Sequence, residues 1–315
     1  MTKNLSAILI GSRATLSVIG FQLLLKLGIS VPLVISGDED PGEDDWRRSL
    51  VKAANDAGYR KGETLIVCSN PHHEETLEKV RAAVADIIIS LQWRRILRPP
   101  LLQLARRGVV NLHNAPLPLL RGCDPFSWAI HDGLERMGVT LHQVRDEGVD
   151  SGPILTQRLW PVTPSATAWS LYLDGLREGE LLMRETLASV IAGAVEPQYQ
   201  EARYTTYHPM GQFRFKDSEA NWNLPAVTVS AALRSRIFPP FQLPYFQVRG
   251  RKVEILGCYV ASGRGSAGSV VSVAPFVVAA KIGSVCIERV RVGETEFSGS
   301  EFAQSVELKP GEMLG

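Results

Sequence analysis

An amide and an imidazole lie two residues apart at the end of an apolar run. In VVNLHNAPLPLL (109–120), Asn111 and His113 flank a single leucine. Residues i and i+2 of a β-strand point to the same face, so these two side chains are predicted to project side by side. Two prolines follow, and proline has no N–H for a strand ladder, so the strand must end near Asn114. Open α/β sheets bind their ligands at this carboxyl end of a strand.

A carboxylate that could complete such a site lies in RDEGVDSGPIL (145–155). Asp150 precedes Ser151 and Gly152, a turn-forming pair between two expected strands, and is therefore expected on an exposed loop. An amide, an imidazole and a carboxylate together can stabilise a developing negative charge and move a proton. Spacing alone leaves a second interpretation open, in which Asp150 caps a turn and His113 is a hydrogen-bonded histidine at a strand end.

Other patterns are weaker signals of chemistry. GSRAT (11–15) follows a strand and opens a helix, as a phosphate-binding turn does, but it matches neither GxGxxG nor GxxxxGK[ST]. His142 lies on an alternating strand and is interpreted as a packing or supporting residue. A zinc site built from His113, His131, His142 and Asp150 has no ligand spacing in its favour, and the cysteines form no CxxC pair, so no metal is predicted.

Composition is that of an ordinary globular protein. The 315 residues are 45% hydrophobic and 21% charged, which is enough chain for two domains. A formal net charge of +1 gives no argument for nucleic acid or an anionic membrane as a bulk partner. The N-terminal segment is interpreted as strand, turn and helix rather than as a signal peptide, and no apolar stretch approaches the ~18 residues of a membrane span. With four scattered cysteines, we expect a cytoplasmic protein.

The first half of the chain alternates apolar runs with amphipathic segments. Strands are expected at 7–10, 31–36, 65–69, 86–90 and 109–113, and helices at 15–27, 45–57 and 74–84. Continuous β-branched runs separated by helices predict a mostly parallel sheet covered on both faces. The predicted class is therefore α/β, with a Rossmann-like domain whose sheet gathers the candidate residues at one edge.

The pattern changes after the prolines. A helix is expected at 125–132, two partner strands at 139–144 and 154–161, and a long helix from an N-cap at Ser165 to Ile191. The polar, aperiodic segment 198–211 is interpreted as a linker. A short helix at 226–237 and several short strands complete the chain. The predicted domains are an α/β domain at 1–204 and a smaller, β-rich domain at 211–315.

Several of these segments, taken in order, resemble one family. NLHNAPLPLLRG…GVTLHQVRDEGVDSGPIL (111–155) is similar to the core of the formyltransferases that use 10-formyltetrahydrofolate. The family's Asn-x-His, prolyl turn ending in Arg-Gly, Gly-Val-Thr and Asp-x-Gly match here at Asn111, His113, Pro118, Arg121, Gly122, Gly138 to Thr140, Asp150 and Gly152. The C-terminal third is similar to the OB-like domain of methionyl-tRNA formyltransferase, and closer still to the formyltransferase half of the enzyme that modifies UDP-aminoarabinose.

The resemblance implies an N-formyltransferase whose co-substrate is 10-formyltetrahydrofolate and whose reaction requires no metal. It implies that 1–204 is a Rossmann-like catalytic domain, that 211–315 is an OB-like domain, and that Asn111, His113 and Asp150 are catalytic. The pterin is expected against two loops, at Leu91, Gln92, Trp93, Val144, Asp146, Glu147 and Gly148. The amine substrate is expected to meet Arg13, Arg121, Asp124 and Trp128.

One departure from the family pattern bears on the acceptor. Many relatives, including the tRNA enzyme, read His-Gly-Ser-Leu-Leu-Pro, whereas residues 113–118 read HNAPLP. This version resembles formyltransferases acting on amino sugars attached to nucleoside diphosphates, so we expect a nucleotide-linked amino sugar as the acceptor. The alternatives are methionyl-tRNA, a siderophore or other secondary-metabolite amine, hydrolysis of the formyl-folate, and a folate-binding module without activity.

Overall fold

The structure is a computed structural model that describes residues 5–37, 42–145, 148–215 and 218–314. The chain forms two compact units whose segments interleave in sequence. Unit 1 comprises Met1–Gly122, Gly138–Trp160 and Asp174–Tyr207, and unit 2 comprises Cys123–Met137, Pro161–Leu173 and His208–Gly315. The last boundary falls within the predicted linker, while two earlier segments belong with the C-terminal unit. The division into domains at 1–204 and 211–315 stays a prediction.

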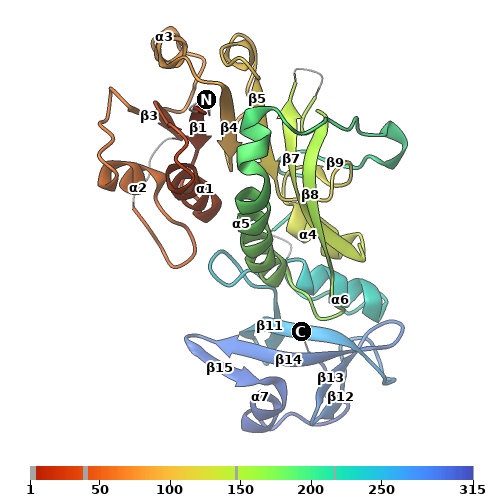
Figure 1. Cartoon of the computed structure of the whole chain (residues 1–315). Helices are drawn as coiled ribbons and strands as arrows, with labels where there is room; N and C mark the ends of the chain where they lie inside the picture. Colours follow the sequence, from red (N-terminus) through yellow and green to blue (C-terminus); the bar gives the residue numbers. More distant parts are fainter. Residues whose placement is uncertain (1–4, 38–41, 146–147, 216–217, 315) are drawn as a thin grey trace. The chain divides into compact units, whose positions relative to one another are not determined.

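Unit 1 is built on a seven-stranded sheet of order β3-β2-β1-β4-β5-β7-β8 (Figure 1). Its strands are β1 (Ala7–Gly11), β2 (Val34–Ser36), β3 (Leu65–Val67), β4 (Ile87–Leu91), β5 (Val109–His113), β7 (Arg136–Val144) and β8 (Ile154–Pro161). The first five strands pair in parallel, and β7 runs antiparallel to β5. The predicted α/β class with a mostly parallel sheet is confirmed.

Helices cover both faces of this sheet. They are α1 (Thr15–Lys26), α2 (Leu50–Asp56), α3 (Glu74–Ala83), the 3-10 turn η1 (Leu101–Gln103) and α5 (Ala168–Ala192). On one face, a Cβ at Gly20 of α1 would lie 2.1 Å from the Leu91 side chain, and Gly179 of α5 faces Leu112. On the other face, α3 and η1 share an apolar core with β1, β2 and β4. None of the helices in the described part of the chain has the length and apolarity to span a membrane.

Two helices begin later than the sequence predicts because side chains cap them at other positions. The Ser49 hydroxyl accepts the Lys52 N–H at 2.8 Å, so α2 begins at Leu50 rather than at 45. The Thr167 hydroxyl accepts the Ser170 N–H at 3.1 Å. Thr167 therefore takes the capping place predicted for Ser165.

Unit 2 contains a six-stranded antiparallel sheet of order β10-β11-β14-β13-β12, with β15 paired to β14. These strands are β10 (Tyr245–Val248), β11 (Arg251–Ala261), β12 (Val270–Val273), β13 (Phe276–Ala279), β14 (Ser284–Val292) and β15 (Thr295–Ser298), and the unit's helices are α4 (Pro125–His131), α6 (Ala226–Arg234) and α7 (Gly299–Ser305). Phe246, Phe276 and Phe302 contact one another in its core. This is the OB-like β-rich domain that the sequence predicts.

The segment predicted as a linker has structure of its own. It contains the 3-10 turn η2 (Ala202–Tyr204) and the strand β9 (Tyr207–His208). The backbone of Gln198 exchanges two hydrogen bonds of 2.8 Å with Ile154. The Thr206 carbonyl accepts the N–H of Arg121, which opens the short strand β6 (Arg121–Gly122). Residues 198–206 are therefore attached to unit 1.

Candidate active site

Asn111 and His113 lie on one face of β5, side by side as predicted. The antiparallel register with β7 places Asn111 opposite His142 and His113 opposite Thr140. Val109 lies on the same face of β5 and packs into the core shared with α3 and η1. The polar pair thus begins where the apolar packing of that face ends.

A buried threonine holds the prolyl turn that follows β5. The Thr140 hydroxyl donates to the Ala115 carbonyl at 2.7 Å and accepts from the Leu117 N–H at 3.4 Å. It also accepts from the Gln157 amide at 2.8 Å. A hydroxyl has one donor and two acceptor lone pairs, so all three are used.

The Asp150 carboxylate joins two histidines. Its Oδ2 lies 3.5 Å from His113 Nδ1 and accepts the Gly122 N–H at 2.9 Å. Its Oδ1 lies 3.4 Å from His142 Nε2. The same His142 nitrogen is 3.2 Å from Asn111 Nδ2. The structure therefore brings the three predicted catalytic residues together with His142 in one group of hydrogen-bonded and ion-paired side chains, and their roles in catalysis stay a prediction.

The charge of Asp150 follows from its surroundings. Burial acts to raise the pKa of the Asp150 carboxyl, but the charge of His113, the hydrogen bond to His142 and the Gly122 N–H outweigh it. The pKa of Asp150 is consequently lower than that of an ordinary aspartate. At neutral pH the side chain is therefore a carboxylate.

Both ring nitrogens of His113 face oxygen acceptors. Nε2 lies 2.9 Å from the Leu120 carbonyl, which can only accept, so Nε2 carries a proton. Nδ1 faces the Asp150 carboxylate. The residue is 8% exposed. Direct donation from His113 to a substrate oxygen, as the sequence predicts, would require His113 to exchange one of these contacts.

His142 is the member of the group that sequence reasoning set aside as packing or support. It is 2% exposed, and its Nδ1 lies 3.0 Å from the Gln143 carbonyl. The signal that could have found it is the i, i+2 pair of Thr140 and His142 on a strand next to the Asn-x-His strand. Only the antiparallel register shows that this pair meets Asn111.

The lowered pKa of Asp150 predicts how stability depends on pH. A lowered pKa in the folded protein stabilises the fold fully above the unfolded value of about 3.9, and this contribution is lost as pH falls through the folded pKa. We expect the free energy of unfolding of the wild type to fall more steeply below about pH 5 than that of Asp150→Asn. Urea unfolding at several pH values measures this, and parallel pH profiles would contradict it.

The first group of predicted folate residues lies at the end of β4. The Leu91 carbonyl accepts the Ser17 hydroxyl at 2.7 Å. Gln92 has a left-handed backbone with φ of 57°, and its carbonyl accepts the Ser12 hydroxyl at 2.5 Å. Trp93 packs against the core shared with α3, and its Nε1 is buried without a hydrogen-bond partner among the described residues.

The second group of predicted folate residues follows β7. Val144 is the last residue of that strand and packs against the same core. The Gly148 carbonyl accepts the Ser151 hydroxyl at 2.9 Å. Asp146 and Glu147 lie outside the described residues.

The residues predicted to meet the amine substrate are divided between the units. In unit 1, the Arg13 guanidinium pairs with Asp44 at 3.0 Å and is thus committed to the loop before α2. Arg121 donates from Nε and Nη2 to Gln200 Oε1, at 3.0 and 2.7 Å. Asp124 and Trp128 belong to unit 2.

Trp128 is part of an aromatic cluster within unit 2. Its ring stacks on His208 with centroids 4.1 Å apart, and Phe213 contacts it edge-on at 5.1 Å. Asp124 precedes α4 with a φ of 55°, and burial raises the pKa of its carboxyl. This packing role of Trp128 is one that the sequence did not predict.

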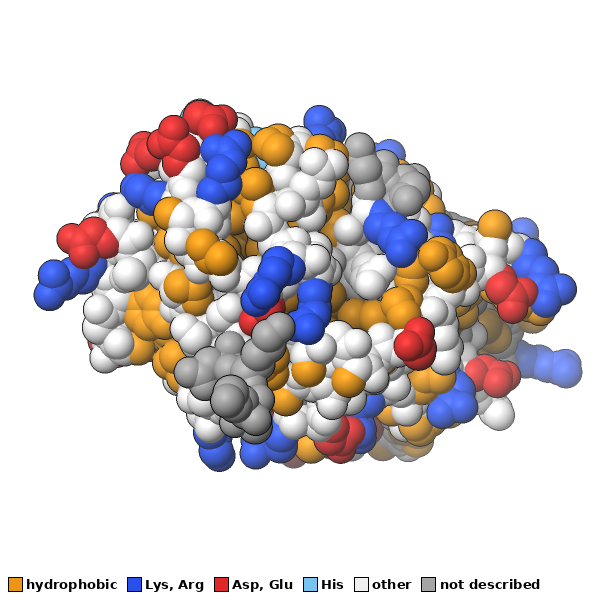
Figure 2. Space-filling model, turned by 45° about the horizontal axis from the view of Figure 1, so that its top comes forward, with side chains coloured by type: hydrophobic (Ala, Val, Ile, Leu, Met, Phe, Trp, Pro, Cys, Tyr) orange, Lys and Arg blue, Asp and Glu red, His pale blue; other side chains and the backbone are white. Residues whose placement is uncertain are grey.

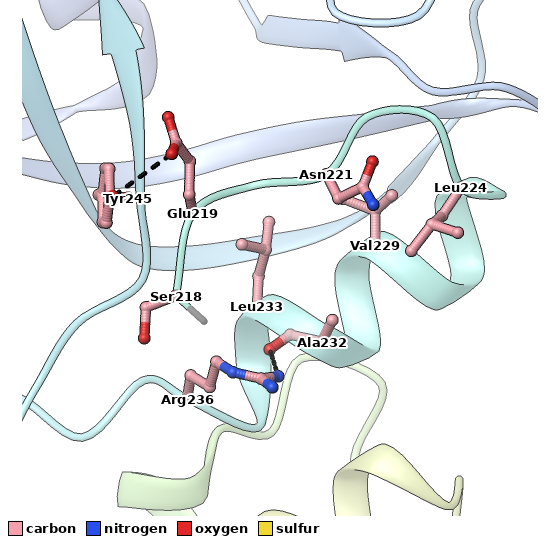
Figure 3. Close-up of a pocket in the computed structure, with 9 residues that line it drawn as sticks. All are labelled: Ser218, Glu219, Asn221, Leu224, Val229, Ala232, Leu233, Arg236 and Tyr245. Carbon is pink, nitrogen blue, oxygen red and sulfur yellow. Dashed lines mark hydrogen bonds between the residues drawn. The ribbon is translucent and has the colours of Figure 1, made fainter. Parts of the chain in front are cut away.

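A pocket of ≈ 510 Å³ lies within unit 2, beside α6 (Figure 3). Its charged groups are engaged with protein partners. Glu219 receives hydrogen bonds from the Tyr245 hydroxyl at 3.4 Å and from Gln247 at 2.9 Å. Arg236 donates to the Ala232 carbonyl at 3.0 Å.

In the part of the chain that the structure describes, no three His, Cys, Asp or Glu side chains are grouped as a set of metal ligands.

Comparison with known proteins identifies the domain that holds the histidine–aspartate group. Residues 41–187 match the model of the formyl transferase family. This stretch includes Asn111, His113, His142 and Asp150. Residues 41–187 are therefore a formyltransferase domain. The family resemblance and the transferase class predicted from the sequence are confirmed.

Solved structures of formyltransferases share the fold of this one. WlaRD, a sugar 3N-formyl transferase solved with dTDP and 5-N-formyl-THF, is 20% identical, with a TM-score of 0.70 over 90% of this chain and 97% of that chain. The N-formyltransferase from Helicobacter canadensis, in complex with folinic acid and dTDP-3-aminofucose, is 22% identical, with a TM-score of 0.72 over 89% of this chain and 98% of that chain.

A longer protein contains the same fold. HypX from Aquifex aeolicus, in complex with tetrahydrofolic acid, is 19% identical, with a TM-score of 0.57 over 94% of this chain and 46% of that chain. At such identities the likeness shows a common fold, and substrates must be argued from the site.

Proposed function

We propose that this formyltransferase transfers a formyl group from 10-formyltetrahydrofolate to the amino group of a nucleotide-linked amino sugar. The observation that carries the proposal is the group of hydrogen-bonded and ion-paired side chains at the carboxyl end of β5, within the segment that matches the family. Its members are Asn111, His113, His142 and Asp150. The folate derivatives and the dTDP compounds bound to WlaRD and the Helicobacter canadensis enzyme support both substrates.

The residues of the site fit the chemistry of formyl transfer. Attack by an amine places negative charge on the formyl oxygen, and a donor aimed at that charge lowers the barrier by about 3 kcal/mol. Asn111 Nδ2, which lies 3.2 Å from His142 Nε2, can supply such a donor. The amine must also lose a proton. Asp150 accepts it directly or through water and shares it with His113 and His142, which contact both of its oxygens.

The end of β4 supports the folate half of the proposal. The Trp93 indole N–H is buried without a partner among the described residues, and a pterin offers ring-nitrogen and carbonyl acceptors for such a donor.

All four cysteines lie in the described part of the chain and none forms a disulfide, which supports the reducing cytoplasm as the location.

A tRNA acceptor has less support. Residues 205–315 carry 12 Lys and Arg against 9 Asp and Glu, a difference of only +3. On the face drawn in Figure 2, basic and acidic side chains are interspersed among neutral ones. Binding of a folded RNA depends largely on phosphate contacts from basic side chains. A small anionic substrate requires far fewer of them.

Arg121 is expected to bind the diphosphate of the sugar nucleotide. An arginine fork pairs with phosphate through two N–H groups, so Arg121→Ala should raise the KM for the sugar nucleotide about tenfold or more. The KM for 10-formyltetrahydrofolate should stay nearly unchanged. Steady-state kinetics in both substrates measure this, with Arg177→Ala on the exposed side of α5 as the control. Equal effects on both KM values would indicate general damage to the loop instead.

A further inference from the structure

The side-chain amide of Gln200 is a junction between two parts of the site. Its Oε1 accepts both Nε and Nη2 of Arg121, at 3.0 and 2.7 Å. Its Nε2 donates to the Asp150 carbonyl at 2.8 Å and to the Gly152 carbonyl at 2.6 Å. One glutamine therefore binds the candidate phosphate-binding arginine and the loop that carries the candidate proton acceptor.

The hydrogen-bonding capacity of this amide is fully used. A primary amide has two N–H donors and two acceptor lone pairs, and these four contacts employ all of them. The contacts also determine the orientation of the amide. The reversed orientation would set N–H groups against the Arg121 guanidinium and Oε1 against two carbonyl oxygens. A carboxylate, a shorter amide or an apolar side chain cannot make the same four contacts.

The Asp150 loop needs such support. Asp150 has a left-handed backbone with φ of 50°, a conformation that non-glycine residues hold only when their surroundings stabilise it. The Gln200 amide binds the carbonyl of this residue and that of Gly152, two residues later. The Asp150 carboxylate is held separately by the Gly122 N–H. Gln200 thus fixes the backbone of Asp150, and Gly122 fixes its side chain.

We propose that Gln200 is a positioning residue for formyl transfer, which holds the Asp150 carboxylate and the Arg121 guanidinium at a fixed separation. This inference rests on the proposed function. A fixed separation selects acceptors whose amine and phosphate groups are spaced to match it. Gln200 then acts on turnover through Asp150 and on acceptor binding through Arg121, without contacting the reacting atoms itself.

Two substitutions separate the contacts of Gln200 with Arg121 from its contacts with the Asp150 loop. Gln200→Glu keeps Oε1 as the acceptor for Arg121 but replaces Nε2 with an oxygen that faces two carbonyls. We expect it to lower kcat about ten- to a hundredfold, since misplacement of a catalytic group by about 1 Å has effects of that size, and to leave the KM for the sugar nucleotide nearly unchanged. Gln200→Ala adds no charge and removes the contacts with Arg121 as well as those with the Asp150 loop. It should therefore lower kcat and raise the KM for the sugar nucleotide together.

Gln198→Glu is the matched control. It adds the same charge two residues earlier, at an exposed side chain whose backbone keeps its bridge to Ile154. The kinetic assay uses 10-formyltetrahydrofolate with dTDP-3-aminofucose. A second readout needs no activity, since hydrogen exchange at the Gly122 amide reports whether the Asp150 carboxylate still binds it. Gln200→Glu and Asp150→Asn should both speed this exchange, and Gln198→Glu should not.

The outcomes distinguish this inference from the proposed function. The positioning role is supported if Gln200→Glu speeds hydrogen exchange at Gly122 and lowers kcat while the KM for the sugar nucleotide stays nearly unchanged. Exchange and kcat equal to those of Gln198→Glu would overturn it. If the wild type formylates neither the amino sugar nor another amine, the proposed function fails. In that case the exchange comparison alone decides whether Gln200 holds Asp150 in place.

Discussion

Asp150→Asn and His113→Ala are each expected to lower kcat for formyl transfer about a hundredfold or more. The asparagine side chain would keep the shape of the aspartate but lose the charge that the low pKa of Asp150 preserves at neutral pH. His113→Ala would remove the imidazole that faces Asp150 Oδ2 at 3.5 Å. Both residues lie at a strand end or in a loop, so the folded state should survive.

Matched controls lie on the surface of unit 1. Asp56→Asn changes an exposed carboxylate of α2 that pairs with Lys52, and His73→Ala changes an exposed imidazole before α3. Both should keep wild-type kcat. Near-normal turnover by Asp150→Asn or His113→Ala would show that the catalytic site lies elsewhere.

Gly152→Ala is expected to damage both stability and turnover. A Cβ at this position would lie 1.9 Å from the Gln143 carbonyl oxygen, which belongs to the backbone of β7 and cannot turn away. The resulting overpacking should cost about 1–3 kcal/mol in the free energy of unfolding. The loop must also shift two residues from Asp150, so kcat should fall about a hundredfold.

Gly58→Ala separates this effect from backbone strain. Gly58 has a φ of 88°, and among the described residues beyond its chain neighbours no atom lies within 4 Å of a Cβ built there. Its substitution should cost about 1 kcal/mol through strain alone and leave kcat unchanged. Urea unfolding and steady-state kinetics compare the two variants. A Gly152→Ala variant as active as Gly58→Ala would refute the tight packing of this loop against β7.

Local patterns predicted the strands that hold the site. The apolar run of β5 and the paired strand β8 have the bounds expected from the sequence, because turn-forming residues mark both of their ends. The starts of α2 and α5 differ because Ser49 and Thr167 cap the helices, and neighbouring polar residues compete for that role. Element types therefore followed from sequence more reliably than their ends.

Long-range contacts had no local signal. His142 enters the site only through the antiparallel register of β5 and β7. Gln200 lies in a polar segment typical of a linker, yet its partners Asp150 and Arg121 are 50 and 79 residues away in the chain. The assignment of Cys123–Met137 and Pro161–Leu173 to unit 2 likewise had no local signal in the sequence. Such pairings depend on how elements pack in three dimensions, and periodicity does not encode that.

The central claim is that a formyl group passes from 10-formyltetrahydrofolate to an amino sugar at the Asp150 site. The most direct measurement incubates the protein with 10-formyltetrahydrofolate and a panel of amino-sugar nucleotides, Met-tRNA, other amines and buffer alone, and follows each product by mass. We predict that a sugar nucleotide gains one formyl group, and that Asp150→Asn slows this gain about a hundredfold or more. Formylation of Met-tRNA or of another amine with none of the sugar nucleotides, or release of formate with no amine formylated, would contradict the account.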